Sequence, residues 1–193
     1  MSDILNGLNP QQKEAVMHTE GPLLILAGAG SGKTRVLTHR IAYLIENGFA
    51  EPEDILALTF TNKAAKEMKE RAASLTGKAA DKMLITTFHS ACVRFLKNRM
   101  MLLGYKRGNF VIYDTDEQKK IIRTIFEETG FQGRYPDIKV YDVISFISKQ
   151  KEKMLGPDEL ESIYPDYPLI TVYKEYERIL KKNNALDFDD LLW

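Results

Sequence analysis

The sequence predicts an α/β fold, in which a parallel β-sheet with helices on both faces carries an all-helical insert. Apolar runs of strand length at 23–26, 55–60 and 83–88 alternate with segments whose apolar residues recur at helical spacing. The strand at 23–26, the helix that ends near Ile45 and the strand at 55–60 predict a right-handed crossover, and therefore parallel pairing. From about 115 to 183 the pattern is helical, with no strong strand. These observations predict a sheet domain first and a helical region after it.

Local signals place the individual elements. Asn9 and Pro10 predict the start of the first helix, because Asn is a good N-cap and Pro suits the first helical position. The run 23–26 is expected to be a buried strand, and Asn62 is expected to cap the helix that follows the second strand. Thr115 with Gln118 forms a capping-box pattern after a further strand at 110–113.

The change of pattern predicts three parts: an α/β part at 1–114, a helical insert at 115–183, and a return to the α/β part at 184–193. The stretch from Leu186 is expected to begin a helix, with Asp187, Asp189 and Asp190 in its first turn. Acidic residues are favourable there because of the helix dipole. We interpret these residues as helix-start acids rather than as a metal site.

Composition limits the function classes. The chain has 27 basic and 27 acidic residues, so a nucleic-acid-binding surface would have to be local. A single cysteine, Cys92, excludes an internal disulfide and suits a reducing compartment. The N-terminal sequence lacks a basic segment followed by an apolar one, and no apolar run is long enough to span a bilayer. We therefore expect a cytoplasmic protein without a membrane partner.

A glycine-rich loop lies between the first predicted strand and the next helix. It comprises Ala27, Gly28, Ala29, Gly30, Ser31, Gly32, Lys33 and Thr34. Glycines allow several backbone N–H groups to point into one space, and the N-terminus of a helix adds partial positive charge. Lys33 can then reach the outer phosphates of a nucleotide, and Thr34 can bind Mg²⁺. Ala27 stands where the usual pattern has glycine, which is tolerable if this position needs no positive φ.

Two predicted strands end in Thr-Phe, at Phe60 and at Phe88. Ligands of open parallel sheets bind at the carboxyl ends of strands, where these aromatic rings could stack on bases. Both phenylalanines could equally be core residues beside helix caps. Gln12 carries a donor and an acceptor that could read the edge of adenine, but its residue type alone fits an exposed helical glutamine as well.

Several stretches together resemble the N-terminal part of the superfamily 1 DNA helicases of the UvrD/PcrA/Rep type, nearest to the bacterial PcrA branch. The matching stretches are 8–16, 27–35, 58–65, 86–90 and 186–191. Their order and spacing match as well, and alanine at the first position of the loop is usual in that family.

The resemblance implies a P-loop NTPase (RecA-like) motor domain, with 115–183 as the insert usually called 1B. It implies an adenine contact for Gln12, a second nucleotide contact for Arg35, and phosphate and magnesium contacts for Lys33 and Thr34. It also implies single-stranded DNA binding by a further set of residues, namely Phe60, Thr61, Asn62, Thr87, Phe88, His89 and Phe188.

The implied activity is that of an ATP-dependent 3′-to-5′ DNA helicase that uses ATP and Mg²⁺. Its partners would be single-stranded DNA and single-strand/duplex junctions in DNA repair or replication. The family's acidic magnesium motif and second motor domain, with its arginines, are expected beyond residue 193. We therefore expect this chain to be a fragment that hydrolyses ATP very poorly and does not unwind DNA. A small P-loop kinase and a non-catalytic nucleic-acid-binding module are the alternatives.

Overall fold

The structure is a computed structural model that describes residues 3–106 and 110–193. The chain divides into two compact units, Met1–Ala91 and Cys92–Trp193. The predicted division at 1–114, 115–183 and 184–193 stays a prediction. Residues 1–2 and 107–109 of its first part lie outside the described residues.

The first unit builds its helices around two small apolar cores. It contains α1 (Pro10–Met17), α2 (Lys33–Glu46) and α3 (Asn62–Thr76). One core joins Leu8, Val16 and Val36. The other is formed by Ile41, Ala57, Met68, Ala72, Ala80 and Met83. Helix α2 contributes to both cores, so the helix that follows the glycine loop is held firmly in place.

A parallel strand pair crosses this unit. Strand β1 (Leu56–Thr59) pairs with β2 (Leu84–Thr87), and Thr59 lies opposite Thr87 at the carboxyl ends. Helix α3 connects these two strands in the chain. The crossover predicted between 23–26 and 55–60 does not form, because 23–26 is not a strand. The 3-10 helices of this unit are Asp3–Leu5, Pro52–Asp54 and Gly77–Asp81.

The prediction of a buried strand at 23–26 is wrong for this structure. The run has no regular secondary structure, and Leu24 and Leu26 are 81% and 87% exposed. A buried parallel strand needs a neighbouring strand for its N–H and C=O groups. Within the described residues, the sheet of this unit consists of β1 and β2 alone.

Two predicted helix caps are also displaced by one residue. Thr61 caps α3, because its hydroxyl accepts a hydrogen bond from the amide of Ala64 at 3.1 Å, and Asn62 is the first helical residue. Asp114 rather than Thr115 caps the next long helix, since its Oδ1 accepts hydrogen bonds from the backbone amides of Asp116 and Glu117.

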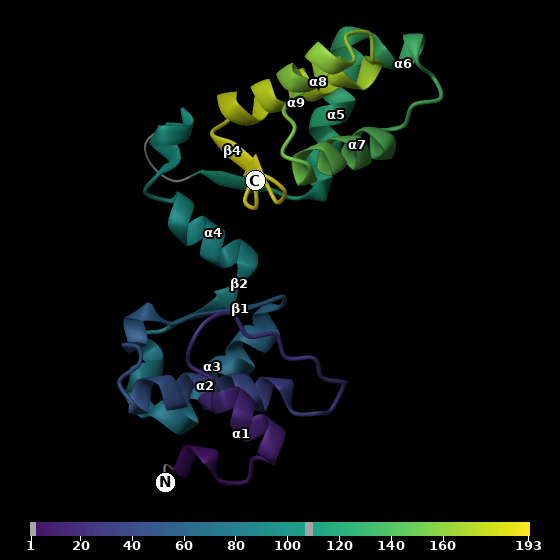
Figure 1. Cartoon of the computed structure of the whole chain (residues 1–193). Coiled ribbons are helices and arrows are strands. Elements are labelled where there is room, and N and C mark those ends of the chain that lie inside the picture. The colour runs from purple at the N-terminus through teal and green to yellow at the C-terminus, as the bar shows by residue number, and fades with distance from the viewer. Residues whose placement is uncertain (1–2, 107–109) are drawn as a thin grey trace. The chain divides into compact units, whose positions relative to one another are not determined.

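The second unit is mainly helical (Figure 1). Its helices are α5 (Thr115–Thr129), α6 (Phe131–Arg134), α7 (Val140–Glu152), α8 (Pro157–Ile163) and α9 (Pro168–Lys182). Helix α4 (Phe88–Leu96) and a 3-10 helix (Met100–Leu103) precede them in the chain. Apolar faces of α5, α7 and α9 form the larger core, which includes Ile122, Ile125, Val143, Ile147, Tyr173, Tyr176 and Leu180.

A second parallel pair, β3 (Val111–Tyr113) with β4 (Ala185–Asp187), replaces the helix expected from Leu186. Ala185, Leu186 and Asp187 are all buried. Because β3 offers backbone partners and the core covers these side chains, extended pairing prevails over a helix start. Asp187 therefore ends a strand, and Asp189 and Asp190 lie in the turn after it instead of opening a helix. In the described residues, no helix is long and apolar enough to cross a membrane.

Candidate functional site

The glycine loop reaches α2 through two glycines with positive φ, Gly30 at +75° and Gly32 at +88°. Gly32 is the N-cap of α2 and makes no side-chain cap hydrogen bond, so the first-turn N–H groups have no such acceptor. A Cβ at Gly28 or Gly30 would meet open space. Ala27 does not adopt a positive φ, so alanine is compatible with the loop at this position. The arrangement fits an anion at the start of α2.

Lys33, the first residue of α2, turns its side chain toward its own loop. The ammonium group donates hydrogen bonds to the carbonyl oxygens of Ala27 at 2.8 Å and Gly28 at 2.7 Å. The Ser31 hydroxyl donates to the same Gly28 oxygen at 2.7 Å. Thr34 is exposed beside Lys33. The residue types present thus fit phosphate and Mg²⁺.

Gln12 links helix α1 to the loop. Its amide nitrogen donates to the carbonyl oxygen of Ser31 at 3.1 Å, and its amide oxygen accepts from the backbone N–H of Asn9 at 3.0 Å. A Cβ on Gly32 would lie 3.1 Å from the Gln12 nitrogen, so this approach favours glycine there. Arg35 is exposed, with its guanidinium close to Gly7. The structure therefore places Gln12 and Arg35 beside the loop, while their nucleotide roles stay predictions.

The two Thr-Phe strand ends lie together in the first unit. The rings of Phe60 and Phe88 have centroids 5.6 Å apart and are tilted by 42°. Phe60 is 91% exposed and Phe88 is 41% exposed, so neither is a core residue. Of the two interpretations left open by the sequence, the structure supports an accessible aromatic pair.

Polar groups surround this pair. Thr61 and Asn62 are exposed at the start of α3, and His89 is half-buried in α4. Thr87 is buried, and its hydroxyl donates to the Ser90 hydroxyl at 2.9 Å, so it orders the turn into α4. These residues form one edge with Phe60 and Phe88. Phe188 belongs to the second unit, where it is 48% exposed and directly follows β4.

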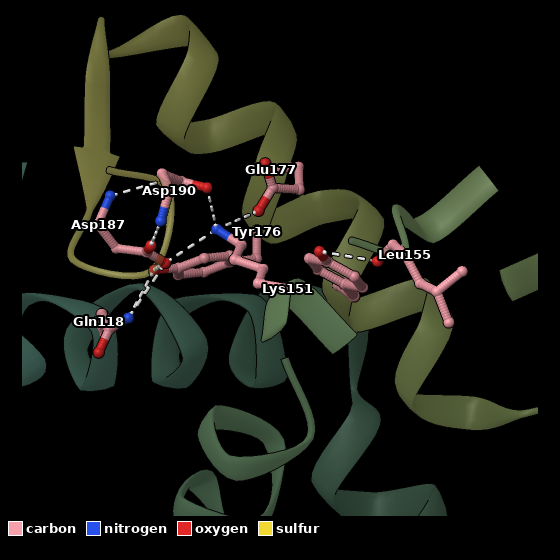
Figure 2. A network of polar contacts seen from close by, with 8 residues as sticks. Gln118, Lys151, Leu155, Tyr176, Glu177, Asp187 and Asp190 are labelled. Carbon is pink, nitrogen blue, oxygen red and sulfur yellow. Dashed lines mark hydrogen bonds and ion pairs between the residues drawn. The ribbon is translucent and has the colours of Figure 1, made fainter. Parts of the chain in front are cut away.

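A buried charge cluster in the second unit is absent from the sequence predictions. The Lys151 cluster consists of Lys151 on α7, Glu177 on α9, and Asp187 and Asp190 at and after β4 (Figure 2). The Lys151 ammonium lies 2.8 Å from Glu177, 2.9 Å from Asp187 and 2.6 Å from Asp190. It occupies the centre of the acidic group, where a metal ion would otherwise have to sit. Across the described ranges 3–106 and 110–193, no group of three or more His, Cys, Asp or Glu side chains could hold a metal ion.

Burial and charge shift the pKa values of this cluster in opposite directions. Burial lowers the pKa of Lys151, but the carboxylates of Asp190, Glu177 and Asp187 outweigh it and raise the pKa overall. Burial raises the pKa of Asp190 to about 7 despite the nearby lysine. At Asp187 burial is outweighed by Lys151 and by hydrogen bonds, so its pKa is lowered. Burial raises the pKa of Glu177, and Lys151 offsets only part of that rise.

One sequence signal could have revealed the cluster. Val143, Ile147 and Lys151 recur every four residues on α7, so the lysine lies on the buried face. A lysine in an apolar stripe requires acidic partners, because an unpaired buried charge is costly. The identity of those partners depends on contacts distant in sequence, which periodicity does not reveal.

With this geometry, the chain can be compared with known proteins. The family described as the UvrD/REP helicase N-terminal domain matches residues 8–193, and the chain belongs to this family. It is 48% identical to an ATP-dependent DNA helicase PcrA of Bacillus subtilis (strain 168), over 99% of this chain and 26% of that protein. It is 46% identical to a PcrA of Staphylococcus aureus (strain Mu50) over 100% of this chain, and again 26% of the relative. The chain thus spans about a quarter of the length of these relatives.

Proposed function

We propose that the chain is the nucleotide-binding N-terminal part of an ATP-dependent DNA helicase with 3′-to-5′ polarity, built on a P-loop (RecA-like) fold. The observation that carries the proposal is the exposed Phe60–Phe88 pair, which lies in the same compact unit as the glycine loop. Its relatives are named ATP-dependent DNA helicases.

The nucleotide would be held by the loop 27–34. The N–H groups that open α2 and the Lys33 ammonium would bind phosphate oxygens, and the Thr34 hydroxyl would bind Mg²⁺. Bound Mg²⁺ supplies positive charge that favours departure of the terminal phosphoryl group. Gln12 would orient the adenine while its existing bond to Ser31 keeps α1 against the loop. Arg35 would add a further contact.

Single-stranded DNA would lie across the carboxyl ends of β1 and β2. Phe60 offers almost its whole ring to a base, and base–aromatic stacking is worth about 1–3 kcal/mol per base. Thr61, Asn62 and His89 would contact the sugar-phosphate backbone, which positions the strand without reading its sequence. Movement along DNA would further require a second motor domain, and we expect the 193-residue chain alone to hydrolyse ATP very poorly.

The test is titration calorimetry of the chain with ATP in magnesium buffer, followed by anisotropy titration with a labelled oligothymidylate. The proposal expects both ligands to bind. Absence of ATP uptake would overturn it. Transfer of phosphate to a nucleoside monophosphate in a coupled assay would instead favour a small P-loop kinase. DNA binding without any nucleotide binding would favour a non-catalytic module.

A further inference from the structure

The Lys151 cluster joins three segments that are far apart in the sequence. Lys151 lies on α7, Glu177 on α9, and Asp187 at the end of β4, and the lysine side chain is fully buried (Figure 2). Gln118 on α5 adds a fourth segment, since its amide donates to Asp187 at 3.2 Å. The Tyr176 hydroxyl donates to the same Asp187 oxygen at 2.8 Å. The end of β4 is therefore fixed from the helical core.

The same cluster closes the turn that follows β4. The Asp187 amide donates to a carboxylate oxygen of Asp190, and the Asp190 amide donates to a carboxylate oxygen of Asp187, both at 2.9 Å. Each carboxylate uses its other oxygen to bind Lys151. Lys151 thus binds Asp187 and Asp190, the two ends of a turn whose inner residues are Phe188 and Asp189.

Phe188 lies in this turn. Its ring is 48% exposed, whereas Asp187 beside it is fully buried. Its direction therefore depends on a backbone that the paired aspartates define. Without the lysine, Asp187, Asp190 and Glu177 would lose the buried ammonium that each of them contacts, and like charges gathered in a buried site repel strongly. The turn would have to open or take up protons.

We propose that Lys151 is a positioning residue for single-stranded DNA binding, which acts from helix α7 by fixing the turn that presents Phe188. The inference rests on the proposed function and on the DNA contact that the family resemblance implies for Phe188. A positioning role differs from a purely structural role in one respect: Lys151 affects DNA affinity only when Phe188 is present.

A double-mutant cycle separates the two roles. The affinity of the 193-residue chain for labelled oligothymidylate is measured by anisotropy for Lys151→Met, Phe188→Ala and the double variant, with urea unfolding to confirm that each is folded. Loss of one stacked base predicts that each single variant weakens binding by roughly 5- to 150-fold. The double variant should bind no more weakly than Phe188→Ala, because coupled residues are not additive.

Two further variants complete the design. Lys149→Met removes the same charge from an exposed position of the same helix and should leave the affinity unchanged. If Lys151→Met does not fold, the triple variant with Glu177→Gln and Asp190→Asn replaces it, since it leaves a single buried carboxylate. This triple variant should fold and still bind DNA less tightly.

The outcomes are distinguishable. If Phe188→Ala weakens binding but Lys151→Met does not, or if the two effects multiply, the positioning role is overturned and the proposed function stands. If Phe188→Ala binds normally while Phe60→Ala is impaired, the positioning role also fails. If both phenylalanine variants bind normally, the proposed DNA site itself is wrong.

Discussion

The ammonium group of Lys33 lies 2.7 Å from the main-chain carbonyl oxygen of Gly28, to which it donates a hydrogen bond. A second bond to Ala27 holds the side chain over the loop. The charge that would bind phosphate is thus already at the loop and satisfied by acceptors weaker than a phosphate oxygen. In the proposed function, phosphate oxygens would replace these carbonyl acceptors.

Lys33→Ala should therefore abolish stabilisation of the chain by ATP·Mg²⁺ while changing the unliganded stability little, since the side chain is exposed. Ligand at a hundredfold over its dissociation constant stabilises the folded state by about 2.7 kcal/mol. Thermal unfolding with and without nucleotide measures this. Lys66→Ala, which removes an exposed lysine from α3, is the control and should keep the full shift. An equal shift in the Lys33 variant would exclude the lysine from the site.

Phe60→Ala should weaken the binding of single-stranded DNA by about 1–3 kcal/mol, because it removes the most exposed ring of the aromatic pair. Nucleotide affinity and stability should hardly change, since little apolar surface is buried there. Anisotropy with oligothymidylate and calorimetry with ATP provide the two measurements. The control is Phe49→Ala, another exposed phenylalanine of the same unit, which stacks on Tyr43. Equal losses in the two variants would indicate a non-specific effect.

The helix after the glycine loop and both strands of the β1–β2 pair follow from local signals. Gly32 adopts a left-handed backbone conformation before α2, and the apolar runs at β1 and β2 form paired parallel strands. The run 23–26 carries an equally clear apolar signal but stays exposed. An apolar run indicates that burial would be favourable. A β-strand also requires a neighbouring strand for its backbone hydrogen bonds, and the pattern of one segment does not reveal that neighbour.

The acidic residues after Leu186 illustrate the same limit at a site. Their residue types fit a helix start, a metal site or an ion pair almost equally. What decides is Lys151, which lies 36 positions before Asp187 in the chain and reaches it only in the folded core. The glycine loop could be predicted because its chemistry is local, whereas the Lys151 cluster is a tertiary feature.

The Lys151 cluster should make the stability of the chain depend on pH. The pKa of Asp190 rises from its usual 3.8 to about 7, so between these values the folded chain holds a proton that the unfolded chain has released. Stability must then fall as pH rises through this window. The pKa of Asp187 is lowered from its usual value of 3.8. The stability that this residue contributes is therefore lost only at pH values below 3.8, as acid protonates the folded chain.

Asp190→Asn mimics the protonated carboxyl and should remove this part of the dependence. Relative to the parent chain, the unfolding free energy of the variant should rise by roughly 2–3 kcal/mol between pH 5 and pH 8. Urea unfolding at several pH values measures the difference. Asp189→Asn changes a carboxylate of the same turn outside the Lys151 cluster, and its unfolding free energy should depend on pH as that of the parent chain does. Parallel stability curves for Asp190→Asn and the parent would show that Asp190 stays ionised throughout.

Tyr176 and Tyr173 form a matched pair for testing the hydrogen bonds of the cluster, since both are buried residues of α9. The Tyr176 hydroxyl donates to Asp187 at 2.8 Å and accepts from Gln118 at 3.1 Å, whereas the Tyr173 hydroxyl makes a 3.4 Å bond to the Leu155 carbonyl oxygen.

Tyr176→Phe should cost about 1.5–3 kcal/mol in unfolding free energy, because it removes a short bond to a buried carboxylate. The loss stays within this range because the Asp187 carboxylate keeps its bonds to Lys151 and to the Gln118 amide. Tyr173→Phe, which loses only a long bond to a neutral carbonyl, should cost less than about 1 kcal/mol. Urea unfolding of the two variants at neutral pH measures both values. A cost at Tyr173 equal to or above that at Tyr176 would mean that the buried charge of Asp187 does not strengthen the hydroxyl contact.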